Sequence, residues 1–257
     1  MEKVILFIYR HRRFIFPAFL LLGAAGLGWW TMSERHPKPQ WRFFADYGIR
    51  LPVDYTIHGI DVSHHNRRID WQKVRNMEAD GVTLQFVFMK ATEGATLVDR
   101  QFRTNWRGAH TVGLKRGAYH FYLPRRDPQK QAQNFIRTVT LAPGDFAPVL
   151  DFEKTSGLPA DKLLDDLRIW LTAIEAHYHV KPIIYTNGHL YSEYIAGNFD
   201  DYPLWIADYS REHLRTYNAR KLYFWQHNKS GWVRGIRGQV DFNVFLMEPE
   251  QMDDICL

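Results

Sequence analysis

Residues 146–153 read FAPVLDFE, an apolar run that closes on two acids, Asp151 and Glu153. Such a run is typical of a buried strand, and side chains two apart on a strand project from the same face, with Cα atoms about 6 to 7 Å apart. We therefore expect the two carboxyls to lie side by side. The charge of one then raises the pKa of the other, which keeps its proton near neutral pH. A plain ion pair or a magnesium site is the alternative interpretation.

Seven more apolar runs alternate with amphipathic stretches from residue 57 onward, which is the pattern of β-α units around a parallel sheet. They start near residues 57 (IHGIDV), 84 (LQFVFMK), 116 (RGAYHF), 182 (PIIYT), 203 (PLWIAD), 222 (LYFWQ) and 239 (QVDFN). Helical patterns fill the first four gaps, the fifth is short, and the later connections are loop-like. We expect an α/β fold, an irregular (β/α) barrel of eight strands over residues 57–257 with an incomplete outer helical ring.

The N-terminus carries a membrane signal. Phe14–Ser33 is a run without a formal charge, preceded by arginines and closed by two tryptophans, and it is long enough to cross a bilayer as a helix. We expect one transmembrane helix before the barrel, with the body outside the cytoplasm. The expected segments are a cytoplasmic basic segment at 1–13, a signal anchor at 14–32 and a stalk at 33–56. A cleaved signal peptide is the alternative.

Composition excludes several classes of function. Residues 1–36 hold 5 of the 33 Lys and Arg and 2 of the 28 Asp and Glu, which leaves a net charge of only +2 for the rest of the chain. A nearly neutral body argues against nucleic acid as a partner. The single cysteine, Cys256, excludes an internal disulfide and a cysteine-rich zinc site. H-E-x-x-H and G-x-S-x-G are both absent, so we expect no metal, no cofactor and no serine hydrolase.

Acids follow three of the apolar runs. In a (β/α) barrel the chemistry lies at the C-terminal ends of the strands, and an ionised group there is costly to bury unless it is used or paired. Asp61 closes the first run, Asp151 and Glu153 the fourth, and Asp208 the sixth. We expect these four acids to converge on one rim of the barrel.

The motifs resemble, in order along the chain, those of the family 25 glycoside hydrolases, the Chalaropsis-type lysozymes. They are GIDVSHHNRRIDW (59–71), FMKATEGATLVD (88–99), GAYHF (117–121), PVLDFE (148–153), IIYT (183–186), LWIADY (204–209), WQ (225–226) and DFNVF (241–245). The resemblance implies a modified β/α barrel. It also implies a muramidase that cuts peptidoglycan between N-acetylmuramic acid and N-acetylglucosamine. Together with the expected anchor, this places the barrel at the periplasmic face of a bacterial inner membrane.

The resemblance also assigns roles. It places Glu153 as the general acid and Asp151, Asp61 and Asp208 as the other active-site acids. It further implies a sugar-binding groove lined by Tyr119, Phe121, Tyr185, Trp205, Tyr209 and Gln226. Packing in the core or rim is the alternative for the aromatic residues. Arg67 departs from the family, which usually has a glycine or other turn residue there, and Lys90 and Glu93 are interpreted as structural polar groups.

Two classes of function remain open. The first is a membrane-anchored hydrolase of peptidoglycan or a related N-acetylated glycan, and the second is an idle barrel that binds glycan as an envelope adaptor. The intact acid set favours the enzyme. Because Asp151 and Glu153 lie on the same side of any bound sugar, we expect the 2-acetamido group to act as nucleophile, oriented by Asp151. Direct attack by Asp61 or Asp208, or activation of a water by either, is the alternative.

Overall fold

The computed structural model describes residues 38–210, 214 and 216–257. The expected cytoplasmic segment and signal anchor lie outside these residues. Within them, no helix combines the length and the apolar character that a membrane crossing requires. The chain divides into two units, Met1–Lys38 with Glu212–Ala219 and Pro39–Arg211 with Arg220–Leu257. The second unit holds the barrel and every residue of the site described below.

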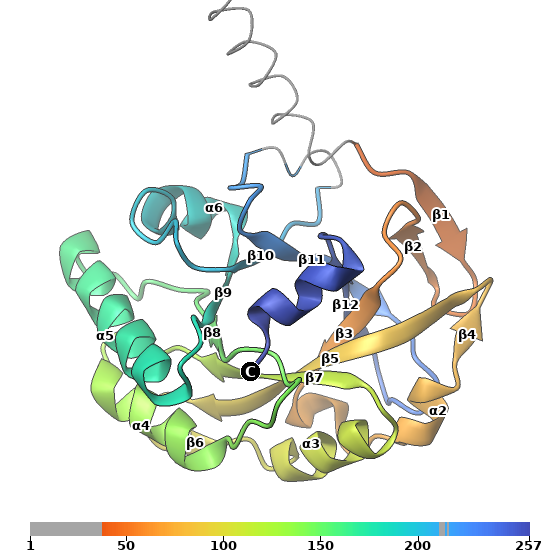
Figure 1. Cartoon of the computed structure of the whole chain (residues 1–257), viewed down its shortest axis with the longest axis horizontal. Coiled ribbons are helices and arrows are strands. Elements are labelled where there is room, and N and C mark those ends of the chain that lie inside the picture. Colours follow the sequence, from red (N-terminus) through yellow and green to blue (C-terminus); the bar gives the residue numbers. More distant parts are fainter. Residues whose placement is uncertain (1–37, 211–213, 215) are drawn as a thin grey trace, which may run out of the picture. The chain divides into compact units, whose positions relative to one another are not determined.

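Eight strands close into a barrel (Figure 1). They are β3 (His58–Val62), β5 (Val82–Glu93), β7 (Lys115–Phe121), β8 (Val149–Asp151), β9 (Ile183–Asn187), β10 (Leu204–Ala207), β11 (Leu222–Gly231) and β12 (Val240–Phe245). Their order is β3-β12-β11-β10-β9-β8-β7-β5, and β5 pairs with β3 to close the ring. Neighbours are parallel except β12, which runs antiparallel to both β11 and β3. All eight predicted runs are strands, so the closed barrel is confirmed.

Aromatic side chains fill the barrel. Phe88 stacks on Trp205 with ring centroids 4.5 Å apart, and Phe86 packs beside Phe88. Two glycines make room for these rings, because a Cβ on Gly59 would lie 2.5 Å from the Phe86 ring and one on Gly117 would lie 2.3 Å from Phe88. The site therefore rests on a solid core rather than on an open channel.

The outer helices are unevenly distributed, as the sequence predicts. The first four connections carry α2 (Trp71–Arg75), α3 (Phe102–Thr111), α4 (Pro128–Thr138) and α5 (Ala160–Tyr178), and the fifth carries α6 (Gly188–Leu190) with η2 (Tyr191–Ile195). Asp127 begins α4 because its carboxylate accepts a hydrogen bond from the Lys130 N–H, with Pro128 in the first turn. In the described part of the chain after β10, no α-helix follows. The incomplete helical ring is confirmed.

The expected stalk is wrong over its second half. Trp41–Phe44 (β1) and Ile49–Pro52 (β2) form an antiparallel hairpin. Phe44, Tyr47 and Leu51 are buried. The rings of Tyr47 and of Phe242 on β12 pack edge to face, with their centroids 5.2 Å apart. The two strands are very short and lie close to prolines, so their alternation cannot be distinguished from a linker in the sequence.

The two ends of the barrel differ. At the N-terminal end of the parallel strands, the C-terminal segment η3 (Pro249–Ile255) packs against the core, with Ile255 buried in it (Figure 1, dark blue). The Ala147 N–H donates to the Ile255 carbonyl at 2.8 Å, and the Gly144 N–H donates to the carbonyl of Leu257 at 2.9 Å. This end is closed, which leaves the opposite rim for a ligand.

Candidate active site

A pocket of about 210 Å³ opens at the C-terminal ends of the parallel strands. Its lining residues are Asp61, Ser63, His65, Lys90, Tyr119, Phe121, Asp151, Glu153, Tyr185, Trp205, Gln226 and Asp241. Three of the four predicted acids and five of the six predicted groove residues are therefore brought together. Asp208 and Tyr209 are not among the residues that line it.

Asp61 is held by two amides. Its Oδ2 accepts a hydrogen bond from Nε2 of Gln226 and another from Nδ2 of Asn243, both at 2.8 Å. The Asn243 amide is oriented in turn, because its Oδ1 accepts from the indole N–H of Trp205 at 2.8 Å. The position of the Asp61 carboxylate is thus set by side chains from β11 and β12.

Two tyrosines orient Gln226. Its Oε1 accepts hydrogen bonds from the hydroxyls of Tyr185, at 2.9 Å, and Tyr209, at 2.6 Å. This leaves the amide N–H of Gln226 pointed at Asp61. Tyr209 therefore connects to the site through its hydroxyl, although its ring lies outside the pocket lining and is 42% exposed.

Asp61 and Asp241 form a coupled pair. They are directly opposed across the β3–β12 ladder, and their side chains share a hydrogen bond. Burial raises the pKa of Asp61 to about 6, against the hydrogen bonds from Asn243 and Gln226 that lower it. Burial and the neighbouring Asp61 raise the pKa of Asp241 to about 8. The pair therefore holds a proton at neutral pH.

Asp241 is the acid that sequence reasoning missed. The prediction considered only acids that end a strand, whereas Asp241 lies near the start of β12. Since β12 is antiparallel to its neighbours, its first residues reach the same rim as the last residues of the parallel strands. One signal was available: Asp241 and Asn243 are two apart in an otherwise apolar VDFNVF run, the same spacing as Asp151 and Glu153.

The structure corrects the placement of Asp208. Trp205 and Ala207 point into the barrel, and side chains alternate along a strand, so the next residue points away from the interior. The Asp208 carboxylate instead accepts hydrogen bonds from the backbone N–H and the hydroxyl of Ser210, at 2.9 and 2.6 Å. The fourth acid in the pocket is Asp241.

Asp151 and Glu153 differ in environment. Asp151 is buried, whereas Glu153 is exposed at the mouth of the pocket. Burial, and then the charge of Glu153, raise the pKa of Asp151 well above its usual range, although Lys90 opposes this. Among the described residues, Oδ1 of Asp151 has no hydrogen-bond partner even though it is buried. A ligand N–H could satisfy this acceptor, since a buried polar atom without a partner is costly.

One lysine and several aromatic rings complete the walls. The Lys90 ammonium lies 2.6 Å from Oε2 of Glu93, and it also lies 4.5 Å from the ring centroid of Phe121. Lys90 thus has a structural role, as interpreted from the sequence, and in addition faces the pocket. Trp205 is only 2% exposed and packs against Phe88 and Tyr185, so the core-packing alternative holds for the faces of its ring.

A metal centre finds no support in the described segments. No three His, Cys, Asp or Glu side chains there are grouped so that they could hold an ion. The histidines next to Asp61 are otherwise engaged, because Nδ1 of His64 lies 2.8 Å from Oδ2 of Asp99 and the His65 ring packs on His64. The charged groups that line this pocket are four carboxyls and the Lys90 ammonium group, beside the imidazole of His65.

Comparison with known proteins gives consistent results. The family described as glycosyl hydrolases family 25 matches residues 60–236. The uncharacterized protein YegX of Escherichia coli K12 is 45% identical over 199 residues, 77% of this chain and 73% of YegX. The autolytic lysozyme of Clostridium acetobutylicum is 31% identical over 188 residues, 73% of this chain and 55% of the lysozyme. A solved family 25 glycosyl hydrolase from Bacillus anthracis is 28% identical, with a TM-score of 0.68, and the match covers 79% of this chain and 95% of that one.

Proposed function

The chain belongs to glycosyl hydrolase family 25, and from this premise we propose that it is a muramidase. It hydrolyses the β-1,4 bond between N-acetylmuramic acid and N-acetylglucosamine in peptidoglycan. The observation that carries the proposal is the carboxyl arrangement at the rim, where exposed Glu153 stands beside buried Asp151 and faces the Asp61–Asp241 pair. A glycan-binding adaptor would have no use for buried carboxyls held in this way, since their burial costs stability.

The proposed reaction follows from the environments of Asp151 and Glu153. Glu153, at the solvent-exposed mouth, donates a proton to the leaving sugar oxygen and then activates a water. Asp151 accepts a hydrogen bond from the N–H of the 2-acetamido group, and the unpartnered Oδ1 is the atom that supports this role. The acetamido oxygen attacks the anomeric carbon, the glycosidic bond breaks, and water then opens the cyclic intermediate. The product keeps its anomeric configuration.

The other two acids of the pocket, Asp61 and Asp241, stabilise the charge that develops on the substrate. Asp61, fixed by Gln226 and Asn243, and Asp241 share a proton across the site. They lie on the rim opposite the strand that carries Asp151, so they are placed to stabilise positive charge that develops on the sugar ring. Direct attack by Asp61 on the anomeric carbon is the competing route.

The activity is tested on purified peptidoglycan. The full chain should release fragments whose new reducing ends are N-acetylmuramic acid, identified by borohydride reduction and mass spectrometry. Release of fragments that end in N-acetylglucosamine would reject the bond assignment. Binding of intact strands with no release of fragments would favour the adaptor instead.

We also propose that residues 14–32 anchor the enzyme in the inner membrane with the barrel on the periplasmic side. The support is the uncharged run itself, the arginines before it and the two tryptophans that close it. After a carbonate wash the protein should remain with the membranes. Recovery of a soluble mature form that begins near residue 27 to 31 would reject the anchor in favour of a cleaved signal peptide.

A further inference from the structure

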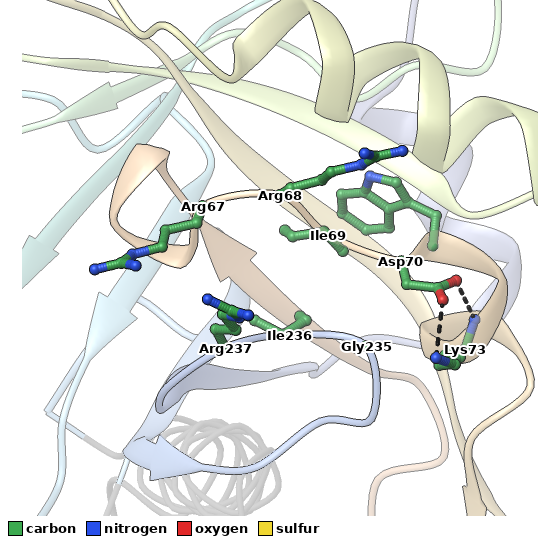
Figure 2. A pocket seen from close by; sticks show the side chains of 9 residues that line it. Arg67, Arg68, Ile69, Asp70, Lys73, Gly235, Ile236 and Arg237 are labelled. Atoms are coloured by element: carbon green, nitrogen blue, oxygen red, sulfur yellow. Dashed lines mark hydrogen bonds and ion pairs between the residues drawn. The ribbon is translucent and has the colours of Figure 1, made fainter.

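A second pocket, of about 820 Å³, lies between the loop that follows β3 and the loop that joins β11 to β12. Arg67, Arg68 and Arg237 contribute to its walls and are exposed. Figure 2 shows Arg67 and Arg237 at one end, and Asp70 with Lys73 at the other. The larger pocket is therefore cationic, although the body as a whole is nearly neutral.

The arginines are available for a ligand. Lys73 is paired with Asp70 at 3.2 Å, so this end of the pocket is neutralised. No acidic side chain in the described residues forms an ion pair or hydrogen bond with Arg67, Arg68 or Arg237. Guanidinium groups bind oxyanions through two parallel N–H donors, which makes a carboxylate or a phosphate the fitting ligand.

The two loops are tied together on both sides of the arginines. At one end Nδ2 of Asn66 donates to the Gln239 carbonyl at 3.3 Å, and at the other the Asp70 N–H donates to the Gly235 carbonyl at 2.9 Å. The second tie needs glycine, because a Cβ on Gly235 would lie 2.5 Å from the Asp70 carbonyl oxygen. Arg67 and Arg237 therefore come from two loops whose backbones are held at a set separation.

The backbone of Arg67 is also strained. Its φ of 58° with ψ of −143° is a conformation that glycine adopts freely and an L-residue does not. A turn residue such as glycine would fit this position better, yet the chain places a long cationic side chain here. Backbone strain of this kind is concentrated at binding and active sites.

The basic pocket adjoins the acid pocket along both loops. Arg67 is two positions after His65, which lines the acid pocket, so their Cα atoms are at most about 7 Å apart. Arg237 is four residues before Asp241, which also lines the acid pocket. A polymer bound over the acids would therefore carry its side groups toward the arginines. The floor is apolar, since Ile69 and Ile236 are buried there, and this suits a ligand with aliphatic parts as well as charge.

We propose that Arg67 and Arg237 bind a carboxylate of the peptide stem attached to the glycan strand that occupies the acid pocket. The proposal rests on the proposed muramidase function and adds a peptide-recognition subsite to it. The apolar floor and the continuity with the acid pocket favour a stem peptide over a phosphate polymer. Peptide-bearing strands are then the preferred substrate, and strands without stems bind more weakly.

The test compares two substrates and three proteins. Full-length parent, the double variant Arg67→Gln/Arg237→Gln and the control Arg103→Gln/Arg234→Gln are assayed on glycan strands with stem peptides and on the same strands after amidase has removed them. Glutamine keeps a Cβ at position 67, so the backbone strain is unchanged. The control loses the same charge from exposed positions outside the pocket, one of them on the same loop.

We expect the pocket variant to raise KM on peptide-bearing strands about tenfold or more, with kcat kept, and to leave cleavage of stem-free strands unchanged. The control should match the parent on both. Equal KM values for parent and pocket variant on peptide-bearing strands would overturn the subsite. A second result would also overturn it: removing the stems leaves the KM of the parent unchanged, and inorganic polyphosphate inhibits the parent but not the pocket variant. That result would assign the pocket to a phosphate polymer. Failure of the parent on both substrates would reject the muramidase function itself, which is a separate result.

Discussion

Asp61 and Asp241 lie opposite each other on β3 and β12, the first and last strands of the barrel, and their carboxyls share a hydrogen bond. Both pKa values are raised above the ordinary value of 3.8, to about 6 and about 8. Because the folded state binds these protons more tightly than the unfolded state, the pair favours folding most below about pH 4. This contribution is lost as the pH rises through the two folded-state pKa values.

Asp241→Asn should therefore stabilise the protein selectively at high pH. An amide keeps the size and one donor of the protonated acid but never ionises. We expect its melting temperature to exceed that of the parent by roughly 3 °C or more at pH 8, and to match it at pH 4. Thermal unfolding followed by circular dichroism at the two pH values measures this. An equal shift at both would show that the pair does not titrate as described.

The same residue distinguishes the two candidates for the fourth acid. Asp241→Asn should lower kcat/KM on peptidoglycan at least about tenfold, because it removes a group that lines the pocket and pairs with Asp61. Asp208→Asn should stay within a few fold of the parent, since its carboxylate bonds to Ser210 outside the pocket lining. A larger loss of kcat/KM in Asp208→Asn than in Asp241→Asn would show that Asp208, not Asp241, is the fourth acid of the site.

Glu153→Gln should abolish most hydrolysis while fold and glycan binding persist. The amide is nearly isosteric with the acid but has no proton to donate at a useful pKa, and general acid–base assistance is worth about 10² to 10⁴ in rate. Glu78→Gln, at an exposed position on β4 (Glu78–Ala79), is the matched control and should have no effect. Turnover of the Glu153 variant within a few fold of the parent would remove Glu153 from the role of general acid.

The acetamido route predicts both the stereochemistry and the substrate requirement. NMR of freshly released reducing ends should show the retained anomer first. Strands that have lost the N-acetyl group should be cleaved at least about a hundredfold more slowly, because they have no amide for Asp151 to orient. An inverted first product would exclude this route and favour activation of a water by Asp61. Undiminished cleavage of the de-N-acetylated strand with retention would exclude it in favour of direct attack by Asp61.

Truncations test the N-terminal hairpin. Removal of residues 1–36 should leave a folded barrel, since the unit that contains it begins at Pro39. Removal of residues 1–52 should destabilise it by about 3 kcal/mol or more, because Tyr47 and Leu51 are fully buried and Phe242 loses its cover. Denaturant titration of both forms gives the difference. Equal stabilities would mean that the hairpin is a dispensable stalk after all.

The barrel could be predicted because its strands are buried, and buried parallel strands are runs of apolar residues that the sequence shows directly. The acids were harder to place. Asp151 and Glu153 follow from their spacing alone, whereas Asp241 depends on the direction of β12, which no local pattern reveals. The placement of Asp208 in the site was wrong because the prediction ignored the alternation of side chains along a strand. Trp205 and a residue three positions later lie on opposite faces.

The basic pocket and the hairpin lay beyond sequence reasoning for a different reason. Arg67 and Arg237 meet only through the ties between Asn66 and Gln239 and between Asp70 and Gly235, contacts that join the beginning of the barrel sequence to its end. Each loop alone is a short polar connection with no periodicity. Such a pocket forms only when the barrel closes, so no local pattern in the sequence predicts which residues line it.

The pairing of β3 with β12 also bears on how the protein is made. The first and last strands of the barrel are neighbours, so the ring cannot close until β12, which ends at Phe245, has been synthesised. Until then Asp61 lacks the complete strand that carries Asn243 and Asp241. A product that terminates before β12 therefore lacks Asp241 and Asn243, and with them part of its own active site.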